Sequence, residues 1–147
     1  MPYERFEKLM EQTKKMKQNQ TVEAPFGQNG TSPKESEDPS EYKIETKIYV
    51  GLNDGETKEQ LFKTEKYLNL LKNVCKNYHI AFSVDIEEGG YFHDNGEYTE
   101  ETSLVLILID VDRNTVREIA KDLCTFFRQE SVLVTEDLVK GYFLYSK

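Results

Sequence analysis

The sequence predicts an α+β fold in which two helices cover one face of an antiparallel sheet. Three observations support this prediction. Apolar residues alternate along several short segments, two longer segments show helical periodicity, and these segments follow the order strand, helix, strand, strand, helix, strand. That order is typical of the ferredoxin-like split β-α-β fold. A chain of 147 residues is long enough for one such domain.

The first half of the domain is predicted to begin with a strand. Every second residue in this strand is apolar or β-branched: Ile44, Thr46, Ile48, Val50 and Leu52. Thr57 and Gln60 then match the capping-box pattern, which predicts a helix over about 57–78. A second strand follows over 80–88, where apolar and polar residues alternate strictly.

The second half begins with "LVLILI" (104–109), an unbroken apolar run that is typical of a strand buried on both faces. Asp112 is placed to cap a second helix. The apolar face of that helix is predicted to contain Val116, Ile119, Ala120, Leu123, Cys124 and Phe127. "SVLV" (131–134) begins another strand. A turn near 135–141 would then allow "GYFLYS" (141–146) to add an extra C-terminal strand.

Residues 1–43 are predicted to form a flexible N-terminal arm, with a short helix at its start, outside the folded domain of residues 44–147. The two predicted helices can cover only one face of the strand 104–109, so its second face needs a cover. We expect a second subunit there, as in a homodimer. The arm folding back onto the sheet is the alternative.

Composition limits the classes of partner. The net charge of −8 argues against direct nucleic-acid binding, because each phosphate contact requires a lysine or arginine. No apolar run is long enough for a membrane span, and the N-terminus has no apolar signal core, so no membrane contact and a cytoplasmic location are predicted. Two cysteines do not make a disulfide framework.

No familiar catalytic or metal-binding motif is present. His93, Asp94 and Glu97 lie close in sequence, but their spacing fits no established metal-ligand motif. Neither Ser103 nor Ser131 lies in a Gly-x-Ser-x-Gly elbow. We therefore predict no catalytic residue, no metal and no cofactor.

Several short motifs over about residues 48–134 are similar to a bacterial family known only as domain of unknown function 3574. They are a glycine that ends the first strand, a glycine and an aromatic residue in the hairpin, a Glu-x-Ser that opens the central strand, and a Gln-Glu-Ser-Val after the second helix. The matching positions are Gly51, Gly90 with Tyr91, Glu101 with Ser103, and Gln129 to Val132. The family tends to have a Trp at the position of Tyr91. The resemblance implies no established activity.

The matched polar residues are predicted to meet at one end of the sheet. The second helix runs back antiparallel to the central strand, so its last turn returns to the beginning of that strand. Two interpretations stay open: a polar latch, in which Gln129 and Glu130 satisfy groups of the hairpin and the helix end, or a small polar pocket. The candidate binding residues are Tyr91, Glu101, Ser103, Gln129, Glu130 and Ser131.

Acidity and many tyrosines favour a protein partner. The sequence therefore predicts a non-enzymatic acidic protein-interaction domain that self-associates. One specific version of this role is an inhibitor of a nucleic-acid-binding protein, encoded by a phage or mobile element. The alternative is a small enzyme or small-molecule-binding protein with a polar pocket near Glu101 and Gln129.

Overall fold

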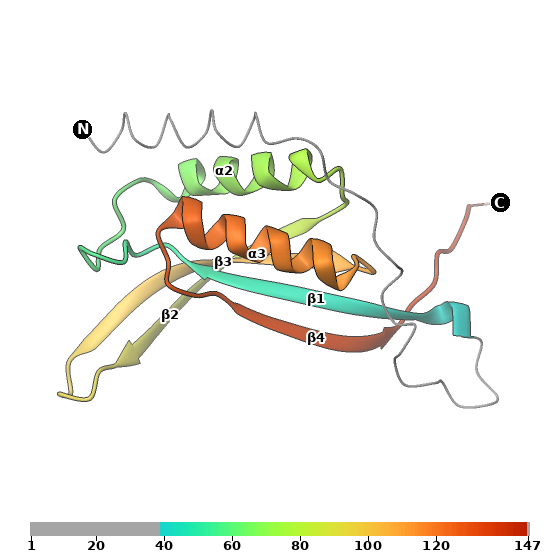
Figure 1. Cartoon of the computed structure of the whole chain (residues 1–147). Coiled ribbons are helices and arrows are strands. Elements are labelled where there is room, and N and C mark those ends of the chain that lie inside the picture. The colour runs from blue at the N-terminus through green and yellow to red at the C-terminus, as the bar shows by residue number, and fades with distance from the viewer. Residues whose placement is uncertain (1–38, 147) are drawn as a thin grey trace.

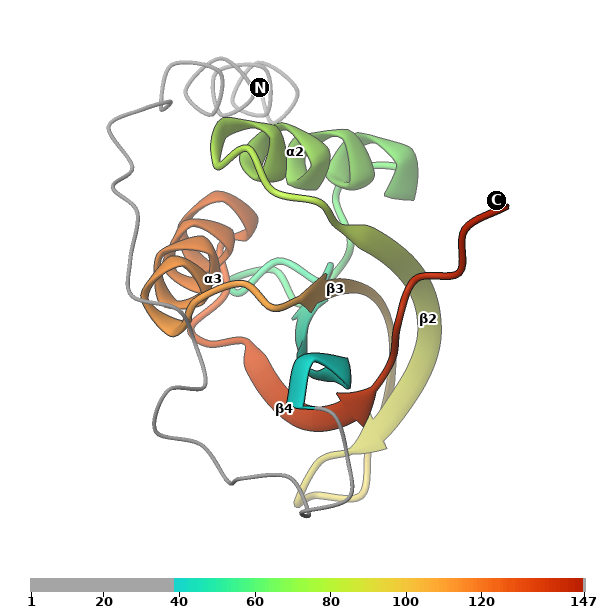
Figure 2. The ribbon, with the colours of Figure 1, turned by 90° about the vertical axis from the view of Figure 1, so that its right-hand side faces the viewer.

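The computed structural model describes residues 39–146, and the predicted arm lies outside them up to residue 38 (Figure 1). The elements are η1 (Pro39–Glu41), β1 (Tyr42–Gly51), α2 (Thr64–Asn77), β2 (Ser83–Phe92), β3 (Tyr98–Ile109), α3 (Arg113–Phe127) and β4 (Leu133–Lys140). The sheet has the order β2-β3-β1-β4 with antiparallel neighbours. Both helices lie on one face of this curved sheet, which confirms the predicted α+β fold (Figure 2).

The core lies between the helices and the central strands. On β1 and β3, the even-numbered side chains over 46–50 and 104–108 face the helices and are buried, because neighbouring residues of a strand point to opposite faces. The fully buried side chains include Ile48, Val50, Leu70, Leu71, Leu104, Leu106, Leu108, Ile119 and Leu123. Among the described residues, neither helix is long and apolar enough to cross a membrane.

The two helix starts differ in how well the sequence predicted them. Asp112 caps α3 as expected, since its carboxylate accepts the Thr115 N–H at 3.0 Å. In contrast, α2 begins at Thr64 and not at residue 57. The Asp54 carboxylate accepts the N–H groups of Glu56 and Thr57 at 2.8 and 3.1 Å. This local turn competes with the helix and removes the predicted capping box.

The predicted extra C-terminal strand is also wrong. β4 continues through residues 135–140, where a turn was expected, and pairs with β1 from Tyr49↔Leu133 to Tyr42↔Lys140. Residues 141–146 form neither helix nor strand. The polar residues of β4 misled the prediction, because an edge strand can expose polar side chains to solvent without leaving the sheet.

The second face of β3 is partly covered within one chain. Val105 is 2% exposed although it does not belong to the helix-side cluster, and Ile107 is half-buried. Val105 lies in register between Tyr49 of β1 and Asp85 of β2. The need for a second subunit on this face is therefore smaller than the sequence suggested, and self-association there stays a prediction.

A hydrogen bond joins the two helices. The Tyr78 hydroxyl, just after α2, donates to the Asp122 carboxylate of α3 at 2.5 Å. Burial raises the pKa of Tyr78 above its usual 10.0, and the adjacent Asp122 carboxylate raises it further. Burial also raises the pKa of Asp122, and the hydrogen bond from Tyr78 opposes that rise. The bond therefore has its full strength when Tyr78 is protonated and Asp122 is ionised.

Replacing Tyr78 by Phe tests this bond. At neutral pH we expect Tyr78→Phe to lower the free energy of unfolding by about 1–2 kcal/mol, because the half-buried Asp122 loses its donor. The pKa of Tyr78 is raised on folding, so its contribution is complete below pH 10.0 and is lost as the pH rises above that value. The difference in the free energy of unfolding between wild type and Tyr78→Phe, measured in urea melts, should therefore become smaller above pH 10.0. A difference that stays constant or becomes larger would contradict this assignment.

Candidate functional site

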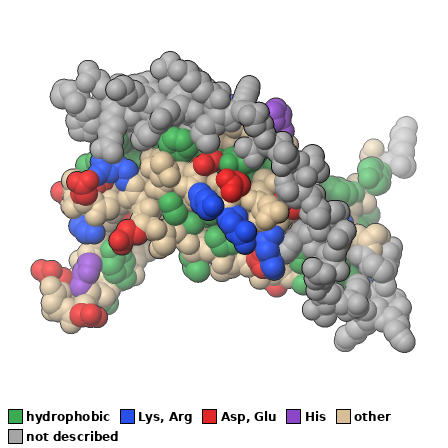
Figure 3. All heavy atoms as spheres, in the orientation of Figure 1, with side chains coloured by type: hydrophobic (Ala, Val, Ile, Leu, Met, Phe, Trp, Pro, Cys, Tyr) green, Lys and Arg blue, Asp and Glu red, His purple; other side chains and the backbone are tan. Residues whose placement is uncertain are grey.

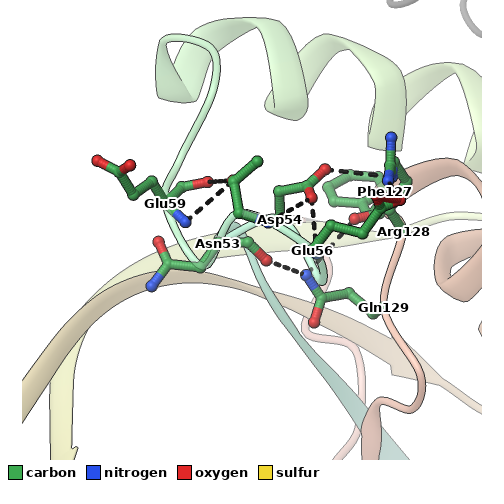
Figure 4. Close-up of polar contacts among 8 residues, drawn as sticks. Asn53, Asp54, Glu56, Glu59, Phe127, Arg128 and Gln129 are labelled. Carbon is green, nitrogen blue, oxygen red and sulfur yellow. Dashed lines mark hydrogen bonds and ion pairs between the residues drawn. The ribbon is translucent and has the colours of Figure 1, made fainter.

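Asn53, directly after β1, is held from two sides. Its N–H donates to Glu101 Oε2 of β3 at 3.0 Å, and its carbonyl oxygen accepts from Gln129 Nε2 at 2.6 Å. Figure 4 shows Gln129 reaching Asn53 from the segment that follows α3. Glu101 and Gln129 therefore meet at one residue at the end of the sheet. Their common partner is the loop after β1, whereas the sequence suggested the hairpin between β2 and β3.

An ion pair fixes the same loop to the end of α3. Asp54 is 5% exposed, and its Oδ2 lies 3.1 Å from Arg128 Nε. Arg128 also pairs with the exposed Glu56 (Figure 4). Gly55 passes so close that a Cβ there would lie 2.7 Å from the Arg128 carbonyl oxygen. The loop is thereby fixed beside Glu101.

Glu101 occupies space that only a glycine leaves free. A Cβ on Gly51 would lie 2.3 Å from a carboxylate oxygen of Glu101. Gly51 pairs with Ser103, and Glu101 pairs with Gly89. Glycines therefore neighbour both Glu101 and Ser103 across the sheet, so the backbone around this carboxylate is open to a close approach.

We call the face of the sheet away from the helices the open face. It is formed by the odd-numbered residues of the strands, because the even-numbered ones pack toward the helices. Its members include Lys43, Glu45, Lys47, Tyr49, Gly51, Asp85, Glu87, Gly89, Glu101, Ser103, Val105, Ile107, Leu133, Thr135 and Asp137. Five carboxylates thus surround a central strip of Tyr49, Val105, Ile107 and Leu133, against two lysines.

A pocket of about 200 Å³ lies over β1 and β4. Its lining is Glu45, Lys47, Tyr49, Thr135, Glu136 and Asp137. Tyr49 lies two residues before Gly51 on the same face, so the pocket and Glu101 lie along one line of the open face. Basic side chains are concentrated elsewhere: α3 carries Arg113, Arg117 and Lys121 at four-residue spacing, and Lys and Arg form a row there (Figure 3).

The other predicted site residues lie apart from this line. Tyr91 is on the open-face side of the hairpin, where its ring packs edge-on to His93 with centroids 5.0 Å apart. Glu130 and Ser131 are exposed between α3 and β4, and Glu130 has no hydrogen bond or ion pair with a described residue. The latch is therefore formed by Glu101 and Gln129, and its assignment to Glu130 was wrong.

Three residues that join the loop after β1 to the end of α3 and to Glu101 were not predicted as site residues: Asn53, Asp54 and Arg128. The signal for the loop was present as an Asn-Asp-Gly sequence after a strand, which favours a turn stabilised by the Asp side chain. Arg128 carried no such signal. Its backbone is left-handed, with φ 57°, at the C-terminal cap of α3, and this turns the following Gln129 toward Asn53.

Comparisons with known proteins place the fold. No family model matches the chain, so the resemblance to domain of unknown function 3574 stays a prediction, and no curated protein is similar in sequence. The apo structure of a phage SAM lyase is similar at 22% identity and a TM-score of 0.53, covering 74% of this chain and 98% of the lyase. A phage SAM lyase in complex with S-methyl-5′-thioadenosine is similar at 21% identity and a TM-score of 0.50, covering 70% of this chain and 93% of the lyase.

These neighbours overturn the main functional prediction. The sequence suggested a non-enzymatic acidic domain that inhibits a nucleic-acid-binding protein, whereas both similar structures are enzymes, and one was solved with a small molecule bound. The findings agree better with the alternative of a small enzyme or small-molecule-binding protein. Net charge misled the prediction, because it does not show where on the surface the charges lie.

Two glutamate substitutions separate the observed latch from the predicted one. We expect Glu101→Ala to lower the free energy of unfolding by about 1–2 kcal/mol, because the partly buried Asn53 N–H loses its acceptor. Glu130→Ala should melt like wild type, since Glu130 is exposed. Urea melts of both variants measure this difference. A Glu101→Ala variant that melts like wild type would show that the contact between Glu101 and Asn53 does not stabilise the loop, and a loss for Glu130→Ala would show that Glu130 takes part in the latch.

Proposed function

We propose that this chain is a small enzyme that binds S-adenosylmethionine and cleaves it to S-methyl-5′-thioadenosine. One observation carries the proposal: the likeness in fold extends over 93% and 98% of the two phage SAM lyase chains. The similarity therefore covers nearly the whole of a lyase and is not confined to one shared motif. The alternative interpretation of the sequence, a small enzyme with polar groups near Glu101 and Gln129, agrees with this proposal.

Charge on the open face supports a cationic substrate. S-adenosylmethionine carries a positive sulfonium and a positive ammonium group against one carboxylate, so it is a net cation at neutral pH. The open face has five carboxylates and two lysines, whereas the basic row of α3 lies on the helix layer. An acidic face of this kind attracts a cation and raises its local concentration.

We assign the proposed contacts along the line from the pocket to Glu101. Glu101 attracts the sulfonium, because its carboxylate lies over Gly51 on the open face and Gly89, its neighbour on the other side, has no side chain that would block a ligand. Tyr49, which lines the pocket, offers its ring to the purine. Ser103, next to Glu101 on the open face, offers a hydroxyl to the ribose.

The chemistry explains how an acidic site can release its product. Formation of S-methyl-5′-thioadenosine breaks the bond between the sulfonium sulfur and the γ-carbon of the amino-acid chain. The bonding electron pair stays on sulfur, which becomes neutral. The γ-carbon forms a new bond to an oxygen of the substrate's own carboxylate, so the amino-acid chain leaves as a five-membered lactone and no outside reactant is needed. A carboxylate beside the sulfur therefore binds the substrate more strongly than the product. The carboxylate therefore contributes to substrate binding and to product release. It does not stabilise a charge that grows in the transition state.

Cellular context completes the proposal. Cys75 and Cys124 are both free thiols, as is usual in a reducing compartment. Burial raises the pKa of Cys75 to about 12, so this thiol is unreactive at neutral pH. We therefore propose that the enzyme works in the cytoplasm.

Product analysis tests the function directly. The purified full-length chain is incubated with S-adenosylmethionine, and S-methyl-5′-thioadenosine is measured by liquid chromatography and mass spectrometry. We expect product to accumulate with wild type. Glu101→Gln should retain the fold, because an amide oxygen can still accept the Asn53 N–H, and should lose at least tenfold in kcat/KM, since one charge contact is removed. Glu100→Gln is the matched control, because Glu100 is the exposed neighbour whose side chain points to the opposite side of the sheet.

A second variant moves the Glu101 carboxylate without changing its charge. Gly51→Ala places a Cβ where the carboxylate lies, so the side chain must shift. We expect this variant to lose activity as Glu101→Gln does. No product and no heat of S-adenosylmethionine binding with wild type would refute the function. Product formation by wild type and both variants at equal rates would refute only the role of Glu101.

A further inference from the structure

The C-terminal tail exposes four consecutive large apolar residues. Tyr142, Phe143, Leu144 and Tyr145 are 64%, 76%, 85% and 80% exposed. In Figure 1 the tail leaves the end of β4 and runs away from the sheet. A contiguous apolar segment of this kind is typical of a contact surface. Neighbouring residues of an extended segment point to opposite sides, so a partner must cover both sides of the tail.

The hairpin between β2 and β3 carries exposed aromatic side chains on both of its faces. On one face the rings of Phe92 and Tyr98 pack with centroids 5.0 Å apart, and on the other Tyr91 packs against His93. Phe92 is 73% exposed and Tyr98 is 53% exposed. β2 is also an edge strand of the described sheet, so the backbone N–H and C=O groups on its outer side have no strand partner among residues 39–146.

The tail is too short to reach the hairpin of its own chain. The tail starts beside Tyr42, because Lys140 pairs with that first residue of β1, whereas the hairpin extends past Gly51, the last residue. The ten residues of β1 span roughly 33 Å. The described tail, residues 141–146, spans at most about 20 Å. Figure 1 shows the two features at opposite ends of the molecule.

We propose that the tail segment Tyr142–Tyr145 of one copy adds as a strand to the outer edge of β2, at Gly90–Phe92, in a second copy. An added strand would gain backbone hydrogen bonds from the unpaired edge. Alternate tail side chains would then cover Phe92 with Tyr98 on one face of the hairpin and Tyr91 on the other. A flat sheet face could cover only one side of the tail, which is why the edge is the better match.

The size and charge of the two surfaces agree with this contact. The four tail residues and three hairpin aromatics expose on the order of 1,000 Å² together, which is near the lower limit for a specific interface. The tail from Tyr142 to Ser146 carries no charge. Asp85, Glu87 and Glu88 lie on the rest of β2, so their charges discourage an uncharged apolar strand there and restrict pairing to the hairpin end.

The contact is head-to-tail, because it joins two different surfaces of the same chain. Such contacts form a closed ring or an open chain of copies. This contact does not depend on the proposed function, since Glu101, Ser103 and Tyr49 take no part in it. The result of its test is therefore independent of whether the chain cleaves S-adenosylmethionine.

A mixing experiment on the full-length chain tests the proposal. One variant carries Phe143→Asp with Leu144→Asp, and the other carries Phe92→Asp. All three positions are highly exposed, so both variants should fold, which circular dichroism checks. Sedimentation velocity should show wild type as an oligomer and each variant alone as a monomer. The mixture should form dimers and nothing larger, because the intact hairpin of one variant receives the intact tail of the other.

Leu61→Asp serves as the control, since Leu61 is an exposed apolar residue in the loop before α2. This variant should assemble like wild type. A wild-type monomer at the highest concentration at which it stays dissolved would overturn the proposal. So would a mixture that stays monomeric, because the contact would then not join hairpin to tail. Dissociation of Leu61→Asp would also overturn it, by showing that any added charge disperses the chains.

Discussion

The pairing of β1 with β3 is the constraint on which the other features depend. These strands lie at the centre of the sheet, in a register that pairs Val50 with Leu104 and Gly51 with Ser103. With this register the even-numbered side chains of both strands enter the helix-side core. A slip of one residue would move them all to the other face. The same register places Glu101 just beyond the end of β1, where the Asn53 N–H needs an acceptor.

The loop after β1 shows how a partly buried ion pair contributes to placement more than to stability. The Asp54 side chain is 4% exposed and the Arg128 side chain is 23% exposed, so both lose hydration and their attraction adds little net free energy. Removing Arg128 would leave the buried Asp54 carboxylate without this cation, which is more costly. The pair therefore fixes where the loop lies relative to the end of α3. Its effect at the site is indirect: it holds Asn53 where Glu101 and Gln129 can both reach it.

Regular periodicity predicted most of the fold, and local hydrogen bonds explain most of the errors. The order of elements and the cap at Asp112 followed from patterns that repeat along the chain. The start of α2 could not be predicted in this way, because Asp54 forms a turn that competes with the capping box at Thr57. Similarly, the sequence indicated that residues 129–131 return to the start of β3. It could not show that the left-handed backbone of Arg128 turns Gln129 inward and leaves Glu130 in solvent.

The functional prediction from net charge failed for a similar reason, because a property of the sequence did not show its arrangement in the fold. A net charge of −8 describes the whole chain and says nothing about where the charges lie. In the folded chain, the open face combines carboxylates with a strip that contains Tyr49, Val105 and Leu133, while α3 carries a row of basic residues. A surface that imitates nucleic acid would present carboxylates in place of a phosphate backbone. Carboxylates around an aromatic and apolar strip agree instead with the proposed substrate, because a sulfonium nucleoside joins a positive charge to a flat ring.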